Sequence, residues 1–149
     1  MKTFTLALCL LGIGYHVGFA QKPVSEKPTQ FHRLPSSISC SPLQLNECYN
    51  ALENQSVTVR LNDELTIRGT VKTRTSKYGT LETIGIELSE YNQSMFALTR
   101  RQTPDRKTVF TGRIFNSKYA DGFLLQQKGE RYELVKVETG NMLPTCDQR

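Results

Sequence analysis

The sequence predicts a mainly β protein of about seven antiparallel strands, arranged as a meander, a sandwich or an open barrel, with one short N-terminal helix packed on it. Two observations predict this fold. From Ser56 onward, β-branched and aromatic residues alternate with polar residues in short runs. Turn residues separate these runs, and the pair Lys128-Gly129 indicates a tight hairpin. Short strands at such regular spacing are typical of all-β domains.

The alternation also predicts which side chains face the core, because successive residues of a strand point to opposite faces of the sheet. The stretch Lys107–Val137 carries the heaviest apolar load of the chain, and Gly112 within it predicts a bulge or a close approach of another backbone. The residues expected to face inward are Val57, Val59, Leu61, Leu65, Ile67, Gly69, Val71, Ile84, Ile86, Leu88, Phe96, Leu98, Phe110, Ile114, Phe123, Leu125, Tyr132 and Leu134.

A helix is expected over Ser41–Leu52. Ser41 is a good N-cap, Pro42 suits the first helical position, and Gln44 completes a capping box. An apolar stripe at helical spacing follows and is expected to pack on the sheet. It consists of Leu45, Cys48, Tyr49 and Leu52.

Three segments are expected along the 149 residues. Residues 1–20 have a basic start, a short apolar core and small residues before Gln21, which is typical of a cleaved secretory signal peptide. Residues 21–39 contain three prolines among polar residues and read as a flexible linker, with Phe31 and Leu34 as the apolar exceptions. Residues 40–149 are expected to form a single β-rich domain. The protein is therefore expected to be secreted or periplasmic, without a transmembrane anchor.

Three cysteines follow the expected signal peptide: Cys40, Cys48 and Cys146. Export favours at least one disulfide. If the helix forms, Cys40 and Cys48 lie about 12 Å apart along its axis at about 1.5 Å per residue, whereas bridged Cα atoms lie within roughly 7 Å. The preferred pairing is therefore Cys48 with Cys146, and the alternative is Cys40 with Cys146.

The motifs of common enzymes are missing from the sequence. The one histidine after residue 20 is His32, in the expected linker, so a histidine-dependent hydrolase is not expected. No zinc or calcium motif occurs, and neither a metal nor a cofactor is expected. Paired carboxylates still allow a small carboxylate-dependent hydrolase, but Glu82 and Glu87 fall on opposite faces by parity. The leading expectation is a protein that is not an enzyme.

One basic row is a candidate binding face. Removal of residues 1–20 takes away Lys2 and no acid, so the formal charge of +5 becomes +4. Parity places four basic residues in one outward row. Such a row can bind an unknown protein or a polyanionic envelope component. It lacks the interleaved aromatic residues of single-strand binders, so nucleic acid is not expected. The row consists of Arg60, Arg68, Lys72 and Arg74, and Arg100 and Arg101 could lie near it.

The C-terminal part carries a short rhythm of motifs: Gly112-Arg113-Ile114, then Tyr119, Gly122–Leu125 and Tyr132-Glu133-Leu134. This rhythm resembles the β-rich propeptides of secreted metallopeptidases, and Pro144-Thr145-Cys146 resembles the cysteine that blocks the catalytic zinc in some of them. The resemblance implies a free-standing, propeptide-like metallopeptidase inhibitor, since no peptidase domain follows Arg149. The chain also resembles small exported proteins of Bacteroidetes, a resemblance that implies no activity.

Three functions are thus expected, in this order: a secreted, non-enzymatic binding module of unknown ligand, a propeptide-like inhibitor that uses Cys146, and a small carboxylate-dependent hydrolase.

Overall fold

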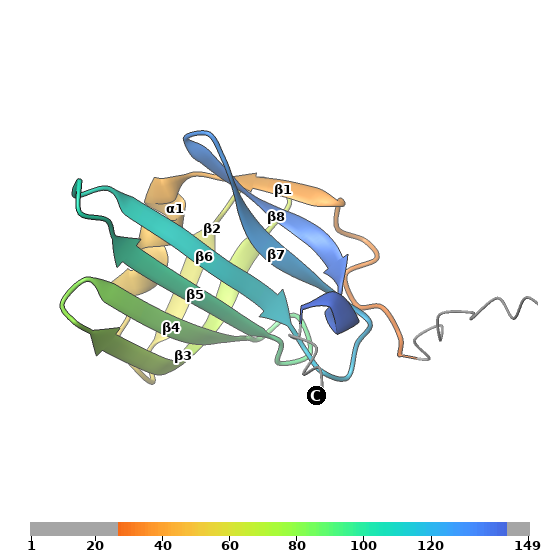
Figure 1. Cartoon of the computed structure of the whole chain (residues 1–149). Coiled ribbons are helices and arrows are strands. Elements are labelled where there is room, and N and C mark those ends of the chain that lie inside the picture. Colours follow the sequence, from red (N-terminus) through yellow and green to blue (C-terminus); the bar gives the residue numbers. More distant parts are fainter. Residues whose placement is uncertain (1–26, 143–149) are drawn as a thin grey trace, which may run out of the picture.

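The computed structural model describes residues 27–142 and confirms the predicted fold class. Its sheet contains eight antiparallel strands in the order β1-β8-β7-β6-β5-β4-β3-β2 and curls into a half-barrel (Figure 1). The strands are β1 (Ser37–Cys40), β2 (Ser56–Arg60), β3 (Thr66–Lys77), β4 (Leu81–Leu88), β5 (Met95–Gln102), β6 (Thr108–Phe115), β7 (Asp121–Lys128) and β8 (Arg131–Glu138).

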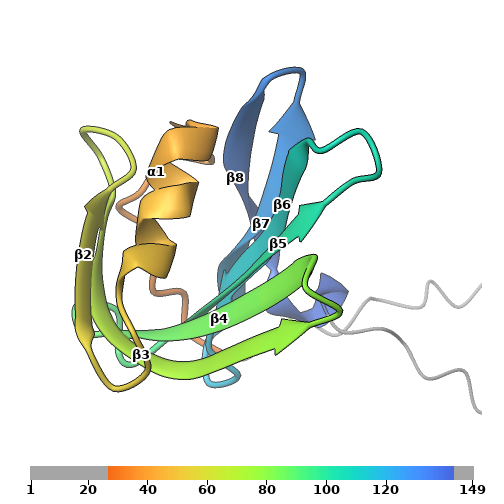
Figure 2. The same cartoon turned by 90° about the vertical axis from the view of Figure 1, so that its left-hand side faces the viewer.

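The two edges of the half-barrel are β1 and β2, and the chain between them fills the hollow of the sheet. This chain forms α1 (Pro42–Glu47) and the 3-10 turn η1 (Cys48–Asn50). Figure 2 shows α1 lying inside the curl, between the β2–β3 side and the β7–β8 side. All of the residues that the alternation predicts to face inward are buried. The hollow, or concave, face of the sheet therefore carries the core.

The helix begins where the sequence predicts but ends earlier. Ser41 accepts a hydrogen bond from the backbone N–H of Gln44, whose side chain accepts one from the Ser41 N–H, so the capping box is confirmed. Leu45 is buried in α1, and Cys48 and Tyr49 are buried in η1. The backbone becomes extended at Ala51. Leu52 therefore leaves the stripe and is 59% exposed.

The described part of the expected linker packs on the sheet instead of standing free. Phe31 is buried and packs against Phe123 with 5.2 Å between ring centroids. The ammonium group of Lys136 donates hydrogen bonds to the carbonyl oxygens of Phe31 and Leu34. Residues 37–40 then form β1, which pairs with β8 and is the strand beyond the predicted seven. The expectation of a flexible linker is therefore wrong for residues 27–39.

A β-bulge interrupts β3 and reverses which face its later residues occupy. The register with β4 shifts between Val71, opposite Ile86, and Thr73, opposite Gly85. A bulge adds one residue to one strand, so parity changes across it. Gly112, the position where the sequence predicts a bulge or a close approach, shows the close approach: a Cβ there would lie 2.8 Å from the carbonyl oxygen of Ala97.

Candidate functional site

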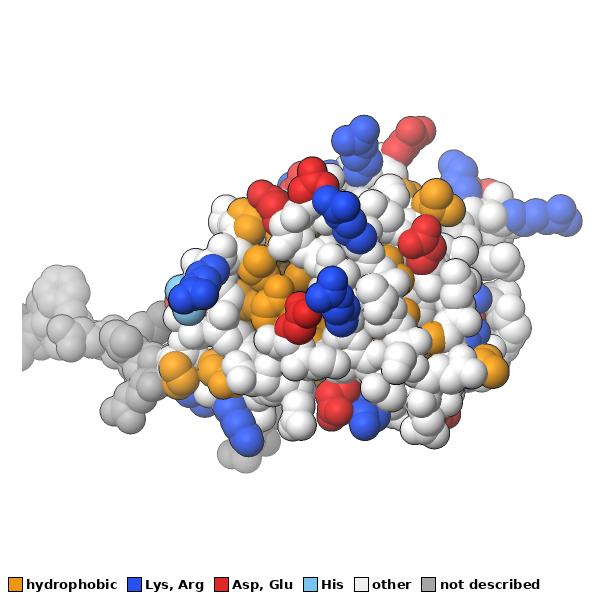
Figure 3. Space-filling view, turned by 180° about the vertical axis from the view of Figure 1, so that it is seen from behind, with side chains coloured by type: hydrophobic (Ala, Val, Ile, Leu, Met, Phe, Trp, Pro, Cys, Tyr) orange, Lys and Arg blue, Asp and Glu red, His pale blue; other side chains and the backbone are white. Residues whose placement is uncertain are grey.

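The predicted basic row is only partly assembled, and its outward members are neutralised. On the face seen in Figure 3, acidic and basic side chains lie next to one another and do not gather into one basic patch. Exposed ion pairs of this kind contribute little stability and leave little net charge to attract an anion. The three pairs are Arg60 with Asp63, Arg68 with Glu90 and Lys72 with Glu87.

The prediction that Arg74 shares this outward face is wrong, because the bulge intervenes. Arg74 lies directly opposite Ile84, whose side chain is buried on the concave face. Two further charged residues lie on this face. Glu82 follows the parity of Ile84, and Arg100 lies opposite Glu82 on β5. The bulge therefore brings Arg74 into a charged cluster at one end of the hollow.

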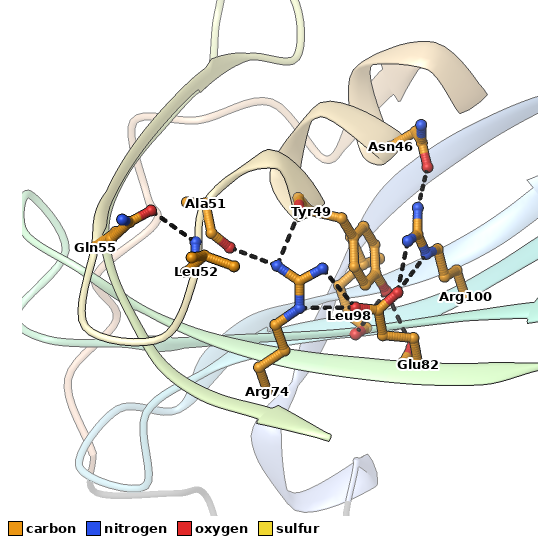
Figure 4. Close-up of polar contacts among 9 residues, drawn as sticks. All are labelled: Asn46, Tyr49, Ala51, Leu52, Gln55, Arg74, Glu82, Leu98 and Arg100. Carbon is orange, nitrogen blue, oxygen red and sulfur yellow. Dashed lines mark hydrogen bonds and ion pairs between the residues drawn. The ribbon is translucent and has the colours of Figure 1, made fainter. Parts of the chain in front are cut away.

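Glu82 is the centre of this cluster (Figure 4). Its Oε1 accepts a hydrogen bond from Arg74 Nε at 2.8 Å and forms an ion pair with Arg74 Nη2 at 2.7 Å. Its Oε2 accepts hydrogen bonds from Arg100, at 2.8 Å from Nε and 2.5 Å from Nη2. Each oxygen of the carboxylate is thus held by a different guanidinium group, through charge-assisted contacts.

The two arginines also hold the helical segment against the sheet. Arg74 donates hydrogen bonds to the carbonyl oxygens of Tyr49 and Ala51, where η1 ends. Arg100 donates to the side-chain oxygen of Asn46 and lies over the ring of Tyr49, 4.3 Å from its centroid. The cluster therefore joins α1 and η1 to β3, β4 and β5.

The charges of the cluster do not balance. Partial burial by itself raises the pKa of Glu82, but the hydrogen bonds from Arg100 and Arg74 and their positive charges outweigh it, so the pKa lies below its usual value. Glu82 is therefore ionised at neutral pH. Two guanidinium groups against one carboxylate leave one positive charge at this end of the concave face.

A polar pocket of about 230 Å³ opens beside the cluster at the ends of β3 to β6. Arg100 and Glu82 reach it from the cluster, and the Arg100 side chain is 31% exposed overall. Hydroxyl and amide groups supply most of the remaining wall. The lining residues are Ser76, Gly79, Thr80, Leu81, Glu82, Arg100, Arg101, Gln102 and Thr108.

The surroundings of the two cysteines within residues 27–142 make their thiols poorly reactive. Cys40 and Cys48 are buried free thiols. Burial, reinforced by Glu133, raises the pKa of Cys40 to about 11, and burial, reinforced by Glu47, raises that of Cys48 to about 12. Both are therefore protonated at neutral pH and poor nucleophiles. Cys146, the partner in both predicted disulfides and the residue behind the inhibitor resemblance, lies outside the described residues.

Residues 27–142 hold no group of three or more histidine, cysteine, aspartate or glutamate residues arranged for a metal ion. None of the helices in this range has the length and apolar character needed to cross a membrane.

The sequence prediction placed Arg74 on the wrong face and considered Arg100 only as a neighbour of the outward row, whereas Arg100 lies opposite Glu82. From the sequence, Glu82 was a candidate only as one member of a catalytic carboxylate pair. The available signal was parity within β4 and β5, which puts Glu82 with Ile84 and Arg100 with Leu98 at the polar end of two buried stripes. An acid and a base at matching ends of neighbouring stripes predict an inward ion pair.

Comparisons with known proteins add no relative: no family model matches the chain, and no curated protein or solved structure matches it either.

Proposed function

We propose that the protein is a secreted, non-enzymatic binding module that holds an anionic group of its ligand in the pocket beside Arg100 and Glu82. The observation that carries this proposal is the uncompensated charge: Arg74 and Arg100 share the single carboxylate of Glu82 at the edge of a polar pocket. A guanidinium group held in place by other contacts loses little entropy when it binds a carboxylate, sulfate or phosphate.

The free donors of Arg100 support this role. Its Nε and Nη2 donate to Glu82 and its Nη1 donates to Asn46, which uses three of five N–H groups. The side chain is still partly exposed in the pocket, where hydroxyl groups and the amide of Gln102 can add hydrogen bonds. The positive charge of Arg101 lies at the same pocket.

Binding suits these residues better than catalysis. A general acid needs a carboxyl pKa near the working pH, but the pKa of Glu82 is lowered by its two arginine partners. Burial raises the pKa of Tyr49 and keeps its hydroxyl protonated. The cluster therefore has a fixed charge and fixed hydrogen bonds, which favours recognition of a charged ligand.

The test is an NMR titration of the isotope-labelled full chain with polygalacturonate, dextran sulfate and neutral dextran. The first two present carboxylate and sulfate groups, and the third is the uncharged control. We expect saturable shifts at Gln102, at Thr80 and at the Arg100 Nε–H with at least one polyanion, and none with dextran. Added salt is expected to weaken the binding.

Two matched variants distinguish the pocket from the outward basic row. Gln102→Glu places a negative charge in the pocket without touching the Glu82 pairs, and we expect it to weaken polyanion binding about tenfold or more. Arg68→Glu reverses a charge on the convex face and is expected to leave binding nearly unchanged. Shifts confined to the convex row, or no shift with either polyanion, would contradict the proposal.

A further inference from the structure

The edge strand β2 borders a second surface that shares no residue with the pocket. β2 pairs only with β3, and its register runs without a shift from Ser56, opposite Thr70, to Arg60, opposite Thr66. An edge strand without a bulge presents a row of backbone donors and acceptors to which another chain can pair.

The hydrogen bonds at the two ends of β2 show which of its backbone groups point to the open side of the sheet. Gln55 accepts from the N–H of Val71, and the N–H of Leu61 donates to Leu65, so residues 55 and 61 bond toward β3. Residues of an antiparallel pair alternate in this respect. Residues 57 and 59 therefore also bond toward β3, whereas the N–H and C=O groups of Ser56, Thr58 and Arg60 point to the side where the sheet has no further strand.

Proline, lysine and bulges, which protect many edge strands, are missing from β2. Its sequence, Ser-Val-Thr-Val-Arg, has no proline, lysine or bulge. Its one charged residue, Arg60, is occupied by Asp63. The open side of β2 borders a groove of about 400 Å³, which also includes residues of α1 and η1. The groove residues are Glu47, Asn50, Ala51, Gln55, Ser56, Val57, Thr58 and Val59.

The charge of this groove indicates its occupant. Glu47 is the only charged residue in the lining, it is exposed, and it belongs to none of the ion pairs within residues 27–142. Charge complementarity therefore favours a basic side chain on the occupant.

We infer that the groove binds an extended peptide segment of a partner protein, which adds to β2 as a further strand and directs a lysine or arginine to Glu47. Backbone pairing with Ser56, Thr58 and Arg60 supplies affinity, and the contact with Glu47 supplies selectivity, as in other cases of strand addition. This site shares no lining residue with the anion-binding pocket.

The probe is a fluorescein-labelled peptide of alternating valine and threonine with a central lysine, and its twin carries a central glutamate. Fluorescence anisotropy with the full chain measures both affinities. We expect the lysine peptide to bind at least about fivefold more tightly than its twin, and Glu47→Lys to reverse that order. NMR shifts with the lysine peptide are expected at Ser56–Val59 and Glu47, and not at the pocket residues.

A proline on each sheet edge provides the matched pair of variants. Thr58→Pro removes a backbone donor that points to the open side. We expect it to weaken binding of the lysine peptide at least about tenfold. Ser39→Pro makes the same change on the free side of β1 and is expected to leave binding unchanged. If Thr58→Pro does not fold, the reversal by Glu47→Lys still tests the proposal.

Three outcomes would overturn the inference. Equal binding of the two peptides would remove the role of Glu47. Shifts on β1 in place of β2 would assign strand addition to the other edge. A dimer in sedimentation equilibrium that Thr58→Pro dissociates would show that a second copy of this chain, and not a partner peptide, occupies the β2 edge.

Discussion

The carboxylate of Asp121 on β7 accepts a hydrogen bond from the backbone N–H of Phe31, with 2.9 Å between Oδ2 and N. Its other oxygen accepts one from the N–H of Gln30 at 2.7 Å. Asp121 is only 7% exposed. A buried charge is tolerated where hydrogen bonds compensate it, so this residue and the segment before β1 depend on each other.

Replacing Asp121 is therefore expected to destabilise the whole domain. Asp121→Ala removes two charge-assisted hydrogen bonds and leaves two backbone donors without acceptors, which we expect to lower the free energy of unfolding by about 3 kcal/mol. Urea denaturation followed by circular dichroism measures this loss. Glu130→Ala, at an exposed hairpin position, is the control and is expected to change stability by less than about 0.5 kcal/mol. Equal effects of the two variants would contradict the role of Asp121.

Phe31 lies in the core, and we expect its side chain to contribute to stability as other core residues do. Phe31→Ala opens a cavity beside Tyr91 and Phe123, and we expect it to cost about 3–5 kcal/mol of unfolding free energy. Leu52→Ala, at a side chain that is 59% exposed, is the matched control with an expected effect near zero. A cost for Phe31→Ala below about 1 kcal/mol would mean that residues 27–36 form the flexible linker that the sequence predicts.

The strands that follow the helix were predictable because burial on one face imposes a period of two, and that period is visible in the sequence. β1 was missed although it has the same signal. Ile38 and Cys40 are buried and alternate with Ser37 and Ser39. A strand of four residues carries only two such matches, and three prolines in residues 21–39 point to a linker. Its pairing with β8 is a long-range contact that local pattern does not encode.

The candidate site was less predictable than the fold for a geometric reason. Parity assigns faces only as far as the next bulge, and neither Lys72 nor Thr73 is a glycine or another residue that would reveal one. The one extra residue of this bulge places Arg74 on the concave face, whereas parity alone predicts the convex face. The cluster with Glu82 and Arg100 then follows from the register of β3, β4 and β5, which the structure supplies.

Glu82 is expected to make stability depend on pH. Its pKa is lower in the folded protein than in the unfolded chain, so its contribution is complete above the ordinary glutamate pKa of about 4.3. The contribution is lost as the pH falls through the lower folded value. At pH 7 we expect Glu82→Gln to cost roughly 2–3 kcal/mol, because the bonds from Arg74 and Arg100 lose their charged acceptor.

Urea denaturation of both proteins between pH 7 and pH 3 tests this linkage. The stability difference between the natural chain and Glu82→Gln is expected to shrink as the pH falls below about 4.3. Glu87→Gln, which interrupts the exposed pair with Lys72, is the control and is expected to cost less than about 1 kcal/mol at pH 7. A difference that stays constant down to pH 3 would contradict the lowered pKa of Glu82.

Cys40 and Cys48 are expected to resist alkylation while the protein is folded. Both thiols are buried, and their raised pKa values of about 11 and about 12 keep them protonated at pH 8. The thiolate is the reacting form, so burial and protonation both slow the reaction. Mass-spectrometric peptide mapping after treatment with iodoacetamide is expected to find no label at either residue in the native protein and full label at both in urea without a reductant. A peptide that joins Cys48 or Cys40 to Cys146 under the same non-reducing conditions would contradict the free thiols and support the disulfide that the sequence predicts.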